Sequence, residues 1–207
     1  MESIDAILYI NLKHRLDRKR HIMEEIHKFC KDDSKIHHID AIYRNPGALG
    51  CGLSHIKALR YALDHPEWNT VLVLEDDFTF HSDSSDEING SIRTLFKHAP
   101  RFDVGLFSYN HHYIRYVDTM NDSVKKVLFS QTTSSYMIRR HYIPDLLQNI
   151  QEATYDMERN GKTEKNCIDI YWTKIQPLGN WYALFPAIGY QYDNYSDIEG
   201  RVTGYGC

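Results

Sequence analysis

Hydrophobic residues in the first half of the chain fall into short runs that alternate with helical repeats. Residues 6–12 and 35–39 form short apolar runs typical of strands. Residues 16–29 and 53–63 carry apolar positions three or four residues apart, the spacing of a helix with one buried face. Residues 70–74 read TVLVL, a continuous run expected of a strand covered on both faces. The pattern predicts strand, helix, strand, helix and strand in that order.

The second half continues this alternation and then adds antiparallel features. A helix is predicted over 88–96 and a buried strand over 103–107. Strand-like segments at 112–117 and 124–129 flank the turn-prone residues 121–123, which predicts a β-hairpin. Because strands and helices alternate, we expect an α/β fold with an open, mostly parallel sheet flanked by helices and a small antiparallel hairpin region in the second half.

A further strand and a longer polar and aromatic region complete the predicted order. Residues 134–138 read as a strand and residues 142–150 as a helix. About forty final residues are rich in tyrosine and turn formers, which favours a site wall or lid over a core element. The 207 residues show no repeat and no low-complexity linker, so we expect a single domain over residues 1–207.

Composition and charge exclude several classes of partner. A net charge of -4 and a pI near 6.3 provide no basic field that would attract nucleic acid. No stretch approaches the roughly 18 apolar residues of a membrane span, and no signal-like segment opens the chain, so we expect a cytoplasmic protein. The four cysteines are scattered without metal-type spacing and are expected to be reduced thiols: Cys30, Cys51, Cys167 and Cys207.

Three adjacent acids follow the TVLVL run. Glu75, Asp76 and Asp77 repel one another, and a bound cation would relieve that repulsion. Carboxylate oxygens suit Mg²⁺ or Mn²⁺, and the carboxyl end of a parallel strand is where open α/β sheets bind ligands. If the strand continues, Glu75 and Asp77 face one side and Asp76 the other. A solvated turn of acids at the strand end stays open as an alternative.

A glycine-containing loop is predicted ahead of the second helix. Residues 45–54 read NPGALGCGLS, in which glycines let the backbone approach a phosphate, and the helix is expected to begin near Leu53. Leu53 stands where a phosphate-loop motif requires lysine, and the glycine order of a dinucleotide fingerprint is missing, so both of those families are disfavoured. An ordinary turn and helix start explains the segment as well.

A series of short motifs follows one another along almost the whole chain. In order they are Tyr9-Ile10-Asn11-Leu12 with Arg15, Asp17 and Arg18; Gly47-Ala48-Leu49-Gly50-Cys51 with Ser54-His55; Val73-Leu74-Glu75-Asp76-Asp77; Thr133-Ser134-Ser135-Tyr136; Asp169; Phe185-Pro186; Gln191; and Ser196-Asp197-Ile198. Taken together, these motifs resemble those of glycosyltransferase family 25, which includes lipooligosaccharide transferases and collagen galactosyltransferases.

The resemblance implies a fold and a donor. The fold is the GT-A type, a Rossmann-like sheet with an acidic metal-binding motif, and the donor is a sugar nucleotide. Residues 1–107 would form the nucleotide-sugar-binding half and residues 108–207 the acceptor side. Glu75 and Asp77 would hold Mn²⁺ or Mg²⁺ against the donor diphosphate, and Asp76 would contact the donor ribose or sugar. The other expected donor-binding residues are Asn11, Leu12, Arg15, Arg18, Gly50, Ser54 and His55.

An inverting transfer, which the resemblance also implies, needs a carboxylate to take the proton of the acceptor hydroxyl. Asp169 lies in an apolar and aromatic stretch where desolvation would make it more basic, although a helix-capping aspartate is an equal interpretation. Asp197 is the second candidate base. The expected reaction moves a hexose, galactose or glucose, from a UDP-sugar to a hydroxyl of a glycan or protein.

Two other functions stay open at this point. A non-catalytic nucleotide-sugar or carbohydrate-binding module would keep the fold without turnover. A sugar nucleotidyltransferase would normally show a glycine-rich loop with a basic residue near the first strand. Residues 11–18 contain basic residues but no glycine, which disfavours that enzyme.

Overall fold

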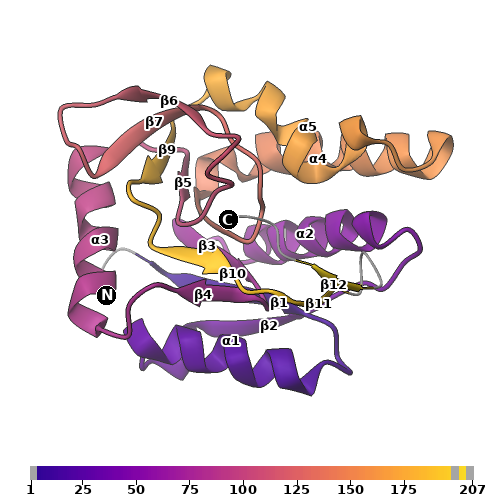
Figure 1. The fold of residues 1–207 in the computed structure, drawn as a ribbon, viewed down its shortest axis with the longest axis horizontal. Helices are drawn as coiled ribbons and strands as arrows, with labels where there is room; N and C mark the ends of the chain where they lie inside the picture. The colour runs from indigo at the N-terminus through magenta and orange to yellow at the C-terminus, as the bar shows by residue number, and fades with distance from the viewer. Residues whose placement is uncertain (1–3, 197–200, 204–207) are drawn as a thin grey trace.

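A central sheet of eight strands runs through the protein, and helices cover both of its faces (Figure 1). The computed structural model describes residues 4–196 and 201–203. Its helices are α1 (Leu16–Phe29), α2 (Gly47–Leu63), α3 (Ser85–His98), α4 (Ile143–Asn160) and the short α5 (Ile168–Tyr171). In spatial order the strands are β2 (Ile36–Asp40), β1 (Ala6–Asn11), β3 (Thr70–Glu75), β8 (Ser135–Arg139), β5 (Val104–Leu106), β9 (Trp181–Leu184), β7 (Val124–Phe129) and β6 (Arg115–Asp118).

Most strands of the sheet point the same way. The strand β1 pairs in parallel with β2 and β3, and β5 pairs in parallel with β9. The strands β8 and β7 run antiparallel to their neighbours, so β2, β1, β3, β5, β9 and β6 share one direction. The predicted α/β fold with a mostly parallel sheet is confirmed, and it brings the carboxyl ends of β1 and β3 beside the amino end of β8.

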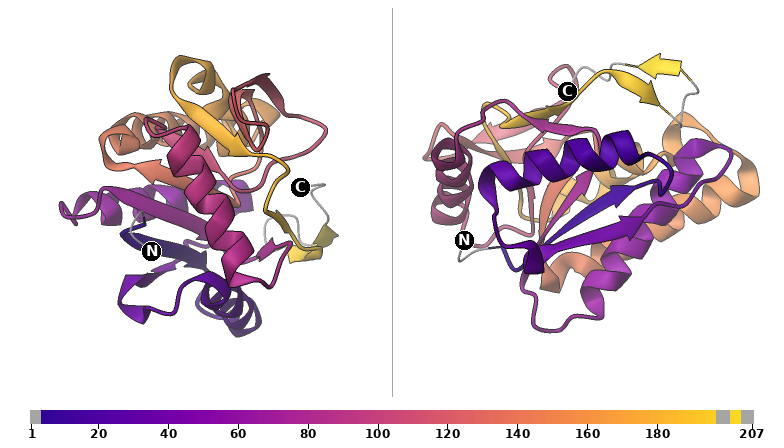
Figure 2. Two further views of the ribbon diagram at one scale, coloured as in Figure 1. Left: turned by 90° about the vertical axis from the view of Figure 1, so that its left-hand side faces the viewer. Right: turned by 90° about the horizontal axis from the view of Figure 1, so that it is seen from below.

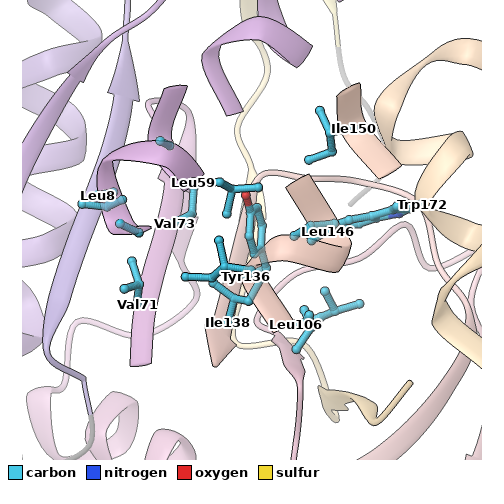
Figure 3. Packing of buried hydrophobic residues seen from close by; sticks show 14 of the residues in the cluster. Leu8, Leu59, Val71, Val73, Leu106, Tyr136, Ile138, Leu146, Ile150 and Trp172 are labelled. Atoms are coloured by element: carbon cyan, nitrogen blue, oxygen red, sulfur yellow. The ribbon is translucent and has the colours of Figure 1, made fainter. Parts of the chain in front are cut away.

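Alternating side chains of the strands build two cores, one on each face of the sheet. Leu8, Val71 and Val73 pack under α2 and α4, where Figure 3 shows them close to Leu59 and Tyr136. The neighbouring strand positions face the opposite way and pack against α1 and α3 (Figure 2). The TVLVL run is therefore covered on both sides, as its composition predicts.

The predicted hairpin is present, but it belongs to the main sheet. Residues 115–118 and 124–129 form β6 and β7, which pair antiparallel and extend the sheet edge through β9. Two smaller antiparallel pairs lie outside the main sheet: β4 (Phe78–Phe80) with β10 (Gly189–Gln191), and β11 (Asn194–Ser196) with β12 (Arg201–Thr203).

Two sequence-based expectations are wrong. The helix α2 begins at Gly47, six residues before the predicted start at Leu53, so most of the expected glycine loop is helical. The final forty residues were expected to avoid the core, yet β9 is a buried strand between β5 and β7. Trp181 of β9 is fully buried, because its ring packs edge-on against the Trp172 ring.

Close packing explains the glycines inside α2. A Cβ at Gly50 would lie 2.4 Å from the carbonyl oxygen of Ile42, and one at Gly52 would lie 2.4 Å from Cγ2 of Thr154 in α4. Glycine lowers helix propensity, but here it lets α2 touch the loop after β2 and the helix α4. These residues serve packing at this point of the fold.

Among the described residues, Cys30, Cys51 and Cys167 are not joined in a disulfide, and Cys207 lies outside the described residues. Each helix among the described residues is too short or too polar to span a bilayer.

Candidate functional site

A cavity of about 720 Å³ opens at the carboxyl ends of β1 and β3. Its walls are formed by the loop after β2, the start of α2, residues 131–133 ahead of β8, and the start of α5. Glu75, Asp76 and Asp77 all line this cavity, so the acidic triplet faces a concave site and not open solvent. Predicted donor-binding residues that also line it are Asn11, Leu12, Arg18, Gly50, Ser54 and His55.

Asp76 is fixed by two buried hydrogen bonds. The Nδ2 group of Asn11 donates to its Oδ2 at 2.7 Å, and Nη1 of Arg18 donates to its Oδ1 at 2.8 Å. Burial raises the pKa of the Asp76 carboxyl, while the Arg18 charge and the Asn11 hydrogen bond oppose that rise. Charge-assisted bonds of this kind hold a side chain in one orientation.

The expected alternation within the triplet stops at Glu75. The strand β3 ends there, and residues 76–77 form a turn. As a result Nη1 of Arg18 reaches both Asp76 and Asp77, the latter at 3.2 Å. The expectation that Asp76 faces away from Asp77 is wrong, because strand geometry does not extend into the turn.

Asp77 is the most strongly perturbed acid of the site. Burial, followed by repulsion from Glu75, raises the pKa of Asp77 to about 7, although Arg18 acts in the opposite direction. Its Oδ1 accepts a hydrogen bond from Nε2 of Gln191 at 3.2 Å. At neutral pH a proton therefore competes with any cation for this carboxylate.

The pKa of Glu75, unlike that of Asp77, is lowered. Burial raises the pKa of its carboxyl, but hydrogen bonds from His55 and Thr133, together with the Arg18 charge, outweigh burial and lower it. His55 Nε2 and Thr133 Oγ1 lie 3.2 Å and 2.7 Å from the same atom, Oε1 of Glu75. Within the described part of the chain, Oε2 of Glu75 makes no hydrogen bond. Glu75 is thus ionised and keeps one oxygen for a ligand.

Asp169, the predicted base, lines the same cavity from the first turn of α5. Burial and repulsion from Glu75 raise the pKa of its carboxyl, while backbone N–H groups of Thr132 and of α5 oppose the rise. The helix-capping interpretation of Asp169 is wrong, because Cys167 is the N-cap residue of α5 and Asp169 lies within the first turn, where it lines the cavity together with the acidic triplet. A carboxylate with raised basicity beside a cavity is suited to accepting a proton.

The segment before β8 carries backbone strain. Thr132 has a φ of 86°, a left-handed conformation that β-branched residues rarely adopt. The preceding Ser130 is held by fully buried side chains: its N–H donates to Gln176 Oε1 at 2.7 Å, and its carbonyl accepts from Trp172 Nε1 at 2.8 Å. Strained residues persist where their surroundings fix them, and such positions cluster at functional sites.

Two predicted donor-binding residues, Arg15 and Ser54, are hydrogen-bonded to other parts of the protein. Arg15 is not among the residues that line the cavity, and its Nε and Nη2 groups donate to Oδ1 and Oδ2 of Asp17 at 3.0 Å and 2.9 Å. The hydroxyl of Ser54 accepts from the Ile42 N–H at 2.8 Å and donates to the Gly50 carbonyl, so it joins α2 to the loop after β2. Asp197 lies outside the described residues.

Sequence reasoning gave no role to several residues that complete the site. Thr133 and Gln191 were named only as parts of the family motifs. In the structure the Thr133 side chain donates a hydrogen bond to Glu75, and the Gln191 side chain donates one to Asp77. Tyr113, from the segment ahead of β6, also lines the cavity. Hydrogen bonds of this kind join residues about 60 to 110 positions apart, and no local pattern in the chain marks them.

The residues fit a divalent cation. Arg18 pairs with two carboxylates of the triplet, Asp76 and Asp77, so about two negative charges remain in excess when all three acids are ionised. Burial is the main cause of the raised pKa of Asp77, and the charges of Glu75 and Asp76 raise it further. Carboxylate oxygens at a cavity wall match the donor atoms that Mg²⁺ and Mn²⁺ prefer, with further positions left for phosphate oxygens.

No protein-family model and no curated sequence matches the chain. Among solved structures, it resembles a glycosyltransferase involved in the glycosylation of the major capsid of PBCV-1, with 10% identity, a TM-score of 0.52, and 87% of this chain and 81% of that one covered. It also resembles the glycosyltransferase GlyE of Streptococcus pneumoniae TIGR4, with 8% identity, a TM-score of 0.51, and 88% and 45% covered. At these identities the likeness shows the fold alone. The chain therefore has a fold that glycosyltransferases use.

Proposed function

We propose that the protein is a metal-dependent glycosyltransferase, similar to family 25, that moves galactose or glucose from a UDP-sugar to an acceptor hydroxyl with inversion. One observation carries the proposal. The acidic triplet after β3, bound by Arg18, and the basic carboxylate of Asp169 line one cavity large enough for a nucleotide sugar. The glycosyltransferase-like fold and the ordered motifs support the same function.

In this proposal the donor half of the cavity lies over β1 and β3. Glu75 and Asp77 would hold Mn²⁺ or Mg²⁺, and the ion would supply Lewis-acid stabilisation of the charge on the leaving diphosphate. Asp76, fixed by Asn11 and Arg18, accepts hydrogen bonds from the donor ribose or sugar hydroxyls. Since Arg18 already contacts both aspartates, it also limits their mutual repulsion before the donor arrives.

Asp169 acts on the acceptor in this scheme. As the acceptor oxygen forms a bond to the anomeric carbon, the bond from that carbon to the diphosphate breaks, and Asp169 takes the hydroxyl proton. Its pKa is raised by burial and by Glu75, which makes it a stronger base than an exposed aspartate. The acceptor is a glycan or protein hydroxyl.

A donor-hydrolysis and transfer assay tests the proposal. UDP-galactose, UDP-glucose and UDP-N-acetylglucosamine are each incubated with the protein, with and without Mn²⁺, and release of UDP is measured. We expect Mn²⁺-dependent release for a hexose donor, and its loss in Asp77→Ala. The exposed Asp64→Ala is the matched control and should keep the wild-type rate.

Two outcomes would assign a different function. Binding of a UDP-sugar with no UDP release in any acceptor mixture would make the protein a binding module. Formation of a UDP-sugar from UTP and a sugar 1-phosphate would make it a nucleotidyltransferase.

Asp169→Asn separates chemistry from donor binding. The amide keeps the shape of the side chain but cannot accept the proton, so we expect UDP-sugar affinity within about threefold of wild type and transfer reduced by about 10²-fold or more. Retained transfer would remove Asp169 from the role of base.

A further inference from the structure

Residues 50–55, which read GCGLSH and lie within the helix α2, carry another chemical feature. Cys51 and His55 lie four residues apart in α2, and residues at this spacing share one face of a helix. This face of α2 packs against the end of β3, where His55 contacts Glu75. The Cys51 sulfur, a His55 ring nitrogen and a Glu75 carboxylate oxygen all lie within 4.8 Å of one another.

These distances fit ligands of one metal ion. Ligand atoms about 2.0–2.2 Å from a tetrahedral zinc ion stand roughly 3.3 Å from each other. His55 Nε2 and Glu75 Oε1 are 3.2 Å apart, which matches this separation, and the Cys51 sulfur, within 4.8 Å of a ligand atom on each of them, would move closer when an ion binds. Cys51 and Glu75 are half-buried, and His55 is fully buried behind them.

A second contact orients the histidine. The other ring nitrogen, Nδ1, lies 3.0 Å from the hydroxyl of buried Tyr136. When Nδ1 carries the proton and donates it to this hydroxyl, Nε2 is left as a lone-pair donor aimed at Glu75. Metal-binding histidines usually have such a partner, which fixes the tautomer and the ring orientation.

We propose that Cys51, His55 and Glu75 form a zinc-binding site at the wall of the cavity. Thiolate, imidazole and carboxylate are the ligands that zinc uses, whereas Mg²⁺ and Mn²⁺ prefer oxygen ligands alone. All three residues line the cavity, so a fourth position is open to water or to a ligand. Coordination replaces the proton of the Cys51 thiol, which is released to solvent.

Zinc binding here is a different property from the proposed transferase activity, although Glu75 takes part in both. An ion held by Cys51, His55 and Glu75 takes the carboxylate that Mn²⁺ would use with Asp77. Zinc and manganese therefore compete, and zinc is expected to inhibit the transferase. Zinc binding itself needs neither a donor nor turnover, so its test is independent of the transferase assay.

Cobalt is the probe, because Co²⁺ takes the place of Zn²⁺ and shows a thiolate-to-metal charge-transfer band in the near ultraviolet. The metal-free full-length protein is titrated with Co²⁺ under reducing conditions. We expect the band to reach its maximum at one equivalent, to disappear when Zn²⁺ is added, and to be unaffected by Mg²⁺.

Variants assign the ligands. Cys51→Ser should abolish the band, and the isosteric Glu75→Gln should weaken Co²⁺ binding at least tenfold. Cys167→Ser is the matched control, since Cys167 is a second thiol at the cavity wall, and it should keep the band. Circular dichroism of each variant verifies folding. A wild-type protein without the band, a band that survives in folded Cys51→Ser, or a band lost in Cys167→Ser would overturn the site.

Discussion

Asp77 is a buried acid whose pKa lies close to neutral pH. Its pKa lies near 7 because it is buried and faces Glu75. The folded protein therefore holds a proton on Asp77 at pH values where the unfolded chain, with the ordinary value of 3.8, has released it. The stabilisation that this proton gives the folded protein is fully present below the unfolded pKa of 3.8, and it is lost as the pH rises through the folded pKa of about 7.

The first prediction concerns this pH dependence. Between about pH 5 and about pH 8, the metal-free wild type should lose on the order of 2 kcal/mol of unfolding free energy relative to Asp77→Asn, whose amide does not titrate. Urea unfolding of both proteins across this range measures the difference. Parallel pH profiles for the two proteins would show that Asp77 does not titrate in this window.

Among the helices, α2 and α3 contain glycines in contrasting surroundings. Gly50 of α2 lies against the backbone of the loop after β2, where a Cβ would meet the Ile42 carbonyl oxygen at 2.4 Å. Gly90 of α3 has only the end of the Arg93 side chain nearby, at 3.8 Å. The same substitution should therefore have opposite effects in the two helices.

The second prediction follows from this contrast. Gly50→Ala should destabilise the fold by about 1–3 kcal/mol, because the backbone must move to admit a methyl group. Gly90→Ala should stabilise it by about 0.5–1 kcal/mol, because alanine is the better helix former. Urea denaturation midpoints give both values, and equal shifts in one direction would contradict the packing described for α2.

The segment between β7 and β8 holds Thr132 in a left-handed conformation. Glycine adopts this conformation without steric cost, whereas any residue with a Cβ loses about 1–2 kcal/mol. The third prediction is that Thr132→Gly is more stable than Thr132→Ala by about 1 kcal/mol. Thermal or urea unfolding of the two variants measures this difference. A more stable Thr132→Ala would show that the segment changes conformation when the threonine is removed.

For the whole molecule, local patterns predict the elements better than their assembly. The predicted helix at 16–29 has the same bounds as α1, because its apolar face repeats regularly and packs on the sheet. The TVLVL run predicted a buried central strand for a different reason, because a continuous apolar run is suited to burial on both faces of a sheet. In contrast, β9 is a short strand after several turns, and its place between β5 and β7 depends on distant pairing partners.

In the site, too, local patterns predict some features, whereas contacts between distant parts of the chain are not predicted. The position of the acids at a strand end predicted a cavity there, because parallel strands end at a ligand-binding edge. The helical state of residues 47–52 was missed, because the glycines that suggest a loop are required by contacts with Ile42 and Thr154. Arg18 as the shared partner of two aspartates depends on the turn at residues 76–77, which the strand pattern does not reveal.

In the proposed function, the acidic triplet binds a divalent ion together with the diphosphate of the donor. Mn²⁺ binding, followed by the signal of the free ion in electron paramagnetic resonance, tests it most directly when measured with and without UDP. If the ion joins the triplet to the diphosphate, UDP and Mn²⁺ should each tighten the binding of the other by the same factor, about tenfold or more, and Asp77→Ala should remove this coupling. Equal Mn²⁺ affinity with and without UDP in the wild type would show that the ion does not join the triplet to the diphosphate.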